Sequence, residues 1–221
     1  MAAYVAAPVG IDSTIAIGHR IDGDFRPEVT DSLGRRRILD ADWTMLTEDH
    51  GTETLVVDHP GQHDGCAGDA LYTSVRDAVI GVWVGDCAPI ALIGERGIGI
   101  AHAGWRGLRD GVLESLLRVF AERDDRPLSG VIGPHIGTCC NEFGPADLES
   151  MTDRFGPPVR GVDAAGRPAL DIGAVARAIL GRHGVGRVVE VASCTKCHPE
   201  FFFSHRRGDQ GRQVMAIVID E

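Results

Sequence analysis

A cysteine and a histidine lie at the two ends of what the sequence predicts to be a β-hairpin. Cys87 stands just before the apolar run 90–93, His102 follows the apolar run 98–101, and Gly-Glu-Arg-Gly joins the two runs. A hairpin brings its outer ends together, so we expect the two side chains to lie close in space. Such a pair can bind zinc or act as nucleophile and base, and a buried thiol beside a hydrogen-bonded histidine is the structural alternative.

The residues around His102 favour a functional site over simple packing. His102 opens the sequence His-Ala-Gly-Trp-Arg-Gly, in which small residues let a metal ion or ligand approach the imidazole closely. Pro89 limits strand pairing at the start of the first run, as suits the rim of a site.

A metal at this position would need a third ligand. His50 lies at the turn before the apolar run 54–57, although a histidine in such a turn is more often a surface residue than a ligand. The segment 59–69 is rich in polar and turn-forming residues, so we expect it to be an exposed loop. That loop supplies the competing ligands His59, His63 and Cys66.

Charged residues near the hairpin suggest further roles. Asp86 adjoins Cys87, and it could orient a metal-bound histidine or act as an acid or base. Arg106 is a candidate phosphate contact, because a guanidinium matches the oxygens of phosphate. Arg35, in a run of three arginines, is a second such candidate, and a solvated helix face is the alternative.

Four other cysteines form two close pairs along the chain. Cys139 and Cys140 are adjacent in a Gly-rich turn, a pattern more typical of packing than of a metal site. Cys194-x-x-Cys197 has the spacing of a redox or zinc motif, but it lacks a second Cys-x-x-Cys and a thioredoxin-like context. We therefore regard both as weak signals.

The composition narrows the classes of function. Of 221 residues, 43% are hydrophobic and 24% charged, which is typical of a globular protein. A net charge of −10 argues against nucleic-acid binding but allows a small phosphorylated ligand held by a few arginines. No apolar run approaches the roughly 20 residues of a membrane span. The start lacks the basic segment of a signal peptide, so we expect a cytoplasmic protein with reduced thiols.

The elements that position these residues follow from the hydrophobic pattern. Strands outnumber helices and do not alternate regularly with them, so we expect an α+β fold. We expect residues 1–221 to form a single layered domain of packed mixed β-sheets and outer helices. The expected strands are 4–7, 14–17, 54–57, 79–84, 90–93, 98–101, 130–132, 188–191 and 214–219, and the expected helices are 108–123, 145–154 and 171–183.

Five segments keep the order of motifs found in one known family. They are Asp49-His-Gly-Thr-Glu, Gly85-Asp-Cys-Ala-Pro-Ile, His102-Ala-Gly-Trp-Arg-Gly, Gly133-Pro-His-Ile-Gly-Thr-Cys-Cys-Asn-Glu-Phe-Gly, and Phe202-Phe-Ser-His-Arg-Arg followed by Gly211-Arg-Gln. They resemble the laccase-domain family, also called multicopper polyphenol oxidases, whose members act as purine nucleoside phosphorylases. The chain departs from the family at Asn141 and His205, where tyrosine is common.

The resemblance implies a zinc enzyme whose metal is bound by His50, Cys87 and His102. Cys87, His102 and Asp86 would then be the catalytic residues. The implied reactions are phosphorolysis of adenosine and inosine, cleavage of methylthioadenosine, and adenosine deamination. The expected partners are thus a purine nucleoside and phosphate, without nucleic acid or membrane, and with room for a homodimer.

The resemblance also bears on the phosphate contacts and on the competing functions. Arg35 falls where the family has a conspicuous arginine, and Arg106 lies within the most specific motif. One alternative is a copper-dependent polyphenol oxidase, although one Cys-His-His site lacks the ligands of a multicopper enzyme. The others are a zinc-binding cell-wall editing or regulatory protein and a metal-free Cys-His hydrolase.

Overall fold

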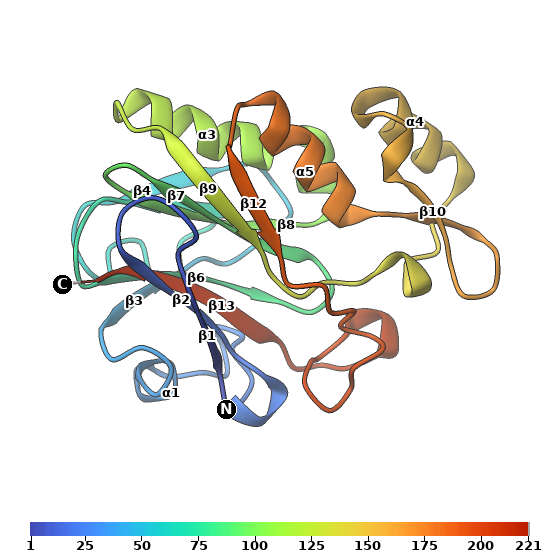
Figure 1. Cartoon of the computed structure of the whole chain (residues 1–221). Coiled ribbons are helices and arrows are strands. Elements are labelled where there is room, and N and C mark those ends of the chain that lie inside the picture. Colours follow the sequence, from blue (N-terminus) through green and yellow to red (C-terminus); the bar gives the residue numbers. More distant parts are fainter. Residues whose placement is uncertain (221) are drawn as a thin grey trace.

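Strand β7 (Ala88–Gly94) shows why this chain folds in layers. All of its residues are buried, with Ile90 and Leu92 in one hydrophobic cluster and Ala91 and Ile93 in another. Side chains alternate along a strand, so a strand buried throughout needs a cover on both faces. The computed structural model, which describes residues 1–220, places helices over one face and a second sheet against the other (Figure 1).

The first sheet contains the predicted hairpin. Strands β7 and β8 pair antiparallel with Pro89 opposite His102, whereas β9 and β12 pair parallel. In spatial order, the six strands are β12 (Arg187–Glu190), β9 (Pro127–Ile132), β7, β8 (Ile98–Ala103), β5 (Ala70–Thr73) and β4 (Thr54–Val57).

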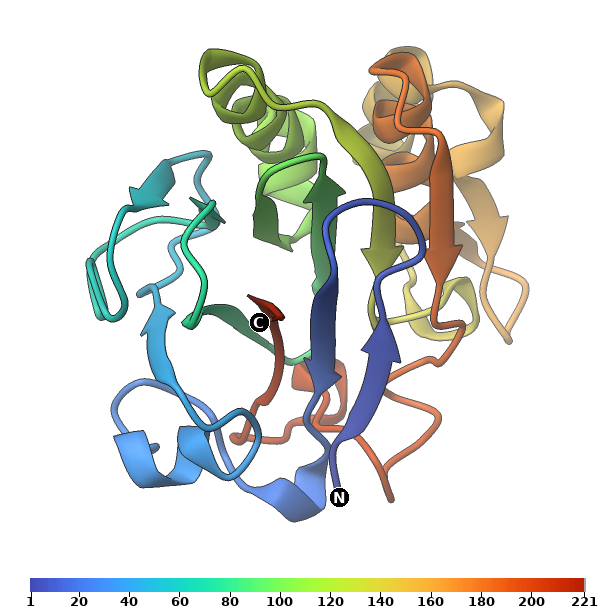
Figure 2. The ribbon, with the colours of Figure 1, turned by 60° about the vertical axis from the view of Figure 1, so that its left-hand side comes forward.

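The second sheet joins the two ends of the described chain. Its central strand is β13, in which Met215 pairs with Ile17 on one side and Val82 on the other. The dark blue N-terminal strands and the red C-terminal strand of this sheet can be followed in Figure 2. The buried apolar residues between the two sheets form one continuous cluster. In spatial order, the five strands are β1 (Ala3–Ala6), β2 (Ser13–Ile17), β13 (Gln213–Ile219), β6 (Ala78–Val84) and β3 (Asp42–Met45).

Helices cover the outer face of the six-stranded sheet, whereas of the described helices only the short α1 lies against the five-stranded sheet, beside β3. Leu113, Leu116 and Phe120 of α3 pack on the six-stranded sheet, and α5 lies beside α3 (Figure 1). Short 3-10 turns occupy Arg20–Asp22, Thr138–Cys140, Pro157–Val159 and His205–Arg207. The helices are α1 (Ser32–Arg36), α2 (Trp105–Asp110), α3 (Val112–Glu122), α4 (Pro145–Phe155) and α5 (Ile172–Arg182).

The α+β prediction is confirmed, and the deviations from it are local. The helix expected over 108–123 is split, because Gly111 adopts φ 108° between α2 and α3. Strands β3 and β5 and helix α1 were not expected, and neither was the hairpin of β10 (Arg160–Val162) and β11 (Pro168–Leu170). All of them are short, so they carry little periodicity. The assignment of residues 1–221 to one domain stays a prediction.

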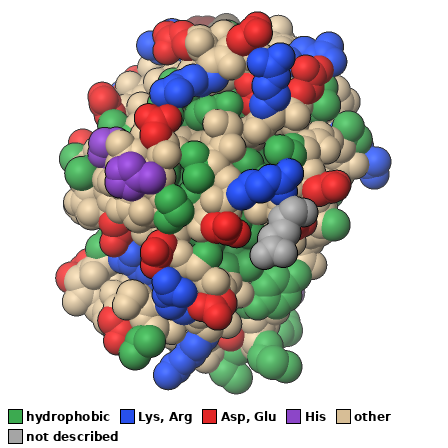
Figure 3. All heavy atoms as spheres, turned by 90° about the vertical axis from the view of Figure 1, so that its left-hand side faces the viewer, with side chains coloured by type: hydrophobic (Ala, Val, Ile, Leu, Met, Phe, Trp, Pro, Cys, Tyr) green, Lys and Arg blue, Asp and Glu red, His purple; other side chains and the backbone are tan. Residues whose placement is uncertain are grey.

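On the face shown in Figure 3, basic and acidic side chains are interspersed, and no basic patch covers it. Within residues 1–220, no helix has both the length and the apolar character needed to cross a membrane.

Candidate metal centre

The hairpin and the turn before β4 bring Cys87, His102 and His50 together. One potential ligand atom from each residue lies within 4.8 Å of the other two. The Cys87 Sγ lies 3.9 Å from the His50 Nε2, and the two imidazole centroids are 4.8 Å apart. The three residues expected to bind metal therefore share one site, whereas His59, His63 and Cys66 are not part of it.

A fully buried carboxylate that the sequence did not reveal organises this triad. Asp69 accepts a hydrogen bond from His102 Nδ1 at 2.8 Å, and from the backbone N–H groups of His50 at 3.1 Å and Gly51 at 2.7 Å. With Nδ1 engaged, His102 is left with Nε2 as its ligand atom, as is usual for metal-bound histidines. The carboxylate also holds His50 at φ 64°, a strained conformation for a non-glycine residue.

A second carboxylate, Glu48, adds to the charge balance of the site. Its side chain is 2% exposed, its Oε2 lies 3.6 Å from His102 Nδ1, and its Oε1 accepts a hydrogen bond from Trp83 N. Burial raises the pKa of Glu48 to about 8. Burial alone would lower the pKa of His102, but Glu48, Cys87 and Asp69 together raise it well above its ordinary value.

The imidazoles in turn favour the thiolate form of Cys87. Burial raises the pKa of this thiol, but His102 and His50 outweigh burial and bring the pKa down to about 6. Cys87 is therefore ready to act as a thiolate, the form that binds metal and the form that acts as a nucleophile. Its ionisation fits both the zinc and the metal-free interpretation.

Gly104 and the types of donor favour the metal. A Cβ at Gly104 would lie 2.9 Å from the Cys87 Sγ and 3.2 Å from the His50 Cδ2, so the glycine keeps space free beside both donors. One thiolate and two imidazoles are donors that zinc prefers, and three protein ligands leave a position for substrate. The residues present therefore fit a zinc ion.

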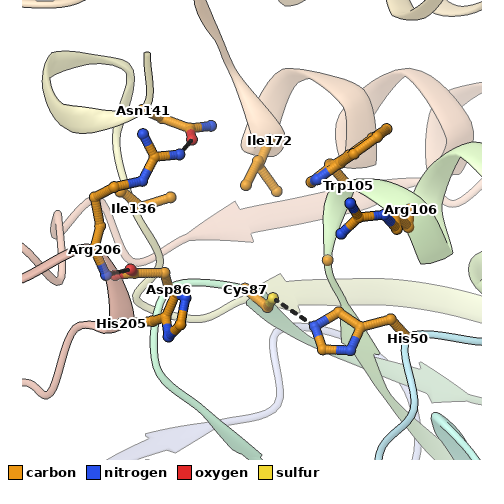
Figure 4. A pocket seen from close by; sticks show the side chains of 11 residues that line it. His50, Asp86, Cys87, Trp105, Arg106, Ile136, Asn141, Ile172, His205 and Arg206 are labelled. Carbon is orange, nitrogen blue, oxygen red and sulfur yellow. Dashed lines mark hydrogen bonds between the residues drawn. The ribbon is translucent and has the colours of Figure 1, made fainter. Parts of the chain in front are cut away.

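A pocket opens beside the triad (Figure 4). One hollow of about 310 Å³ and a second of about 390 Å³ adjoin there, within the size range of ligand sites. Trp105, Ile136 and Ile172 supply apolar walls, and the guanidinium groups of Arg106 and Arg206 lie on opposite sides. The residues that line both hollows are His50, Asp86, Cys87, Arg106 and His205.

Asp86 lies in the pocket, but it does not orient a histidine of the triad. Its Oδ1 accepts a hydrogen bond from the Thr195 hydroxyl at 2.5 Å, and its Oδ2 accepts one from Arg206 N at 2.7 Å. Asp86 thus anchors the segment after β12 to the site, and the orienting role belongs to Asp69. A catalytic role for Asp86 stays a prediction.

The two arginines predicted to contact phosphate lie in different places. Arg106 is exposed in the pocket, with its Cζ 4.6 Å from the Trp105 ring centroid. Arg35 is buried, its Nη1 pairs with Asp64 at 2.8 and 2.9 Å, and it lines a separate hollow beside Trp43. The structure therefore does not bring Arg35 to the triad, because α1 lies on the outer side of the five-stranded sheet.

Sequence reasoning also missed the opposite wall of the pocket. Arg206 Nη2 donates to Asn141 Oδ1 at 3.2 Å, and His205 stands beside them. The closing Phe-Phe-Ser-His-Arg-Arg motif was a signal for this wall. The motif did not show that residues 205–206 would return to the end of the hairpin.

Comparison with known proteins gives further evidence on the family of this chain. A family described as multi-copper polyphenol oxidoreductase laccase matches residues 26–220. A purine nucleoside phosphorylase of Aquifex aeolicus is 29% identical over 152 residues, 69% of this chain and 71% of that protein. Adenosine deaminase RL5, from an unknown prokaryotic organism, is 33% identical over 150 residues, 63% and 56% of the two chains. The crystal structure of YlmD from Geobacillus stearothermophilus matches with TM-score 0.80 and 25% identity, covering 99% of this chain and 96% of that one.

Proposed function

The chain belongs to the multi-copper polyphenol oxidoreductase laccase family, and from this premise we propose that it is a zinc-dependent purine nucleoside phosphorylase. The observation that carries the proposal is the His50–Cys87–His102 triad, oriented by Asp69 and open to a pocket with apolar walls and two arginines. Relatives named purine nucleoside phosphorylase and adenosine deaminase support this substrate class. Deamination of adenosine and cleavage of methylthioadenosine belong to the same proposal.

The proposed zinc is held by His50, Cys87 and His102. When bound, it supplies Lewis acidity at a position left open to substrate. Asp69 fixes the ring of His102 and the backbone of His50, so the ligands are preorganised. To hold the ion, Cys87 would be a thiolate and the two imidazoles neutral, so the protons of the metal-free site would be released.

The pocket residues would position the reactants. Trp105, Ile136 and Ile172 offer apolar surface to a flat purine, and Arg106 and Arg206 offer guanidinium groups to phosphate. In phosphorolysis, a phosphate oxygen bonds to the anomeric carbon as the carbon–nitrogen bond breaks, and the base leaves with the electron pair and gains a proton. In deamination, water adds to the ring carbon that bears the amino group, the carbon–nitrogen bond breaks and ammonia leaves. Asp86 is the proposed acceptor of the water's proton and its donor to the departing ammonia.

The copper oxidase alternative finds less support in the ligands. Multicopper chemistry needs several copper sites, which are usually rich in histidine. Within residues 1–220, the triad is the one cluster of potential metal ligands that contains histidine. A single Cys-His-His site suits polar chemistry at one metal ion.

The experiment is a nucleoside screen with the metal-loaded protein. Adenosine, inosine and methylthioadenosine are incubated with and without inorganic phosphate, and free base, sugar phosphate and inosine are separated by chromatography. We expect release of the base that depends on phosphate, and its loss in Cys87→Ala. The matched control is Cys66→Ala, which removes an exposed cysteine outside the triad and should keep full activity.

Two results would reject the proposal. If the protein with one zinc bound at the triad converts no nucleoside, the result would favour the alternative of a zinc-binding cell-wall editing or regulatory protein. Faster oxidation of phenols with copper than turnover of nucleosides with zinc would favour the oxidase.

A further inference from the structure

The parallel pairing of β9 and β12 brings two distant loops side by side. Beyond the strands, Val191 N donates to Ile132 O at 2.9 Å, and Thr195 N donates to His135 O at 3.0 Å. The two chains therefore leave the sheet at the same edge and continue in parallel. The first loop carries Cys139 and Cys140, and the second carries Cys194 and Cys197.

The four thiols converge on one point. One sulfur from each lies within 4.8 Å of the others, and the Cys197 Sγ is 3.6 Å from the Cys139 Sγ and 3.4 Å from the Cys140 Sγ. These separations are far longer than the roughly 2.05 Å of a disulfide. They are close to the edge of about 3.8 Å that a tetrahedron of sulfurs has when each lies about 2.3 Å from a central zinc.

The backbone around the thiols is shaped for this approach. A Cβ at Gly137 would lie 3.3 Å from the Cys194 Cβ and 3.4 Å from the Cys139 Sγ, so a larger residue would crowd the two loops. Cys197 N and His198 N both donate to Cys194 O, which turns the Cys194-x-x-Cys197 segment tightly. Cys139 and Cys197 are exposed, so burial in an apolar core does not account for the cluster.

We propose that Cys139, Cys140, Cys194 and Cys197 bind one zinc ion in a structural site, separate from the triad. Four thiolates fill a tetrahedral zinc and leave no position for substrate. Tetrahedral sulfur donors select zinc or iron, and zinc, unlike iron, has no redox chemistry of its own. The sequence showed two weak cysteine pairs, and the fold makes them one four-thiolate cluster.

The site links two loops that form the far wall of the pocket. Asn141 follows Cys140 directly and contacts Arg206, whereas Thr195 lies inside the Cys-x-x-Cys turn and donates to Asp86. The ion would thus fix the positions of Asn141 and Thr195 relative to each other in the pocket wall. In phosphorolysis, its loss should raise the KM more than it lowers kcat, because the triad itself is untouched.

The test counts zinc in the full chain, purified under reducing conditions. We expect about two equivalents in the unmodified protein, and about one in the Cys194→Ser/Cys197→Ser double variant. Cys87→Ala should also hold about one equivalent of zinc, the one in the four-thiolate site, whereas Cys66→Ser should keep both equivalents. The two sites lose metal in different variants, so failure of one assignment is distinguishable from failure of the other.

Cobalt substitution supplies a second readout. Cobalt-loaded Cys87→Ala should show the thiolate charge-transfer and tetrahedral ligand-field bands of a four-sulfur site. This measurement leaves the cluster intact, so it stands even where the double variant fails to fold. Absence of these bands, unchanged zinc in a folded double variant, disulfides seen by mass spectrometry of the reduced preparation, or stoichiometric iron in place of zinc would each overturn the proposal.

Discussion

Replacement of Asp69 by asparagine tests whether the buried carboxylate organises the metal centre. Asp69 accepts hydrogen bonds from His102 Nδ1 and from the N–H groups of His50 and Gly51. Asparagine keeps the shape, but it has one acceptor oxygen in place of two and it carries no charge. At least one of these three donors must then lose its partner or face an NH₂ group.

The expected loss is worked from these contacts. A hydrogen bond to a charged group contributes about 1.5–3 kcal/mol. Loss of an outer partner of a metal-bound histidine typically weakens metal affinity by about 10–100-fold, or about 1.4–2.8 kcal/mol. The two estimates agree, so the zinc dissociation constant of Asp69→Asn should rise by about 10–100-fold, with a similar fall in kcat/KM.

Zinc affinity is measured by competition with a chromophoric chelator, and activity by release of hypoxanthine from inosine with phosphate. The control is Asp64→Asn, which removes the carboxylate paired with Arg35, away from the triad. This control should lose stability but keep its zinc affinity. If Asp69→Asn also keeps the affinity of the unmodified protein, Asp69 is a structural residue and the orienting role is wrong.

Four further predictions concern the metal centre and the two arginines. In zinc-stripped protein, the rate of Cys87 alkylation should rise with pH through about 6. The reason is that His102 helps to lower the pKa of Cys87 against the effect of burial, so the thiolate forms above that pH. Peptide mass spectrometry follows the reaction, and a midpoint near the ordinary thiol pKa of about 8.5 would contradict the assignment. Gly104→Ala should lower bound zinc in elemental analysis while leaving the Tm of the zinc-free protein nearly unchanged, because φ −74° and ψ 164° suit alanine. Full zinc occupancy would show that the space beside the sulfur is not needed. Arg106→Ala should raise the KM for phosphate by about tenfold or more. Arg35→Ala should leave that KM unchanged and lower the free energy of unfolding in urea by about 1–3 kcal/mol, and the reverse pattern would restore Arg35 as the phosphate contact.

The parts of the site within one local element could be predicted from sequence. Cys87 and His102 sit at the two ends of a hairpin, whose apolar runs and turn lie within one short segment. His50 required the family resemblance, because a histidine in a turn carries no signal of its own. These three residues do meet in the structure.

The parts that depend on distant contacts could not be predicted. Asp69 ends a polar segment that resembles an exposed loop, but the backbone returns there to join β5, where the buried carboxylate accepts hydrogen bonds from His102, His50 and Gly51. Arg35 lies in a basic run typical of a solvated face, and only the fold shows that Asp64 covers it. The two cysteine pairs meet because β12 lies parallel to β9, a pairing that neither pair reveals by itself.

The central position of β13 bears on how the chain folds as it is made. Residues 213–219 lie between β2 and β6, so the five-stranded sheet has a gap until they have been synthesised. Until then, β2 and β6 each present an unpaired edge, which can capture other strands. Closing the gap also joins segments from opposite ends of the chain, a long-range step that slows folding. The last strand of the described chain therefore closes those two edges of the sheet, and loss of 213–219 would leave both of them unpaired.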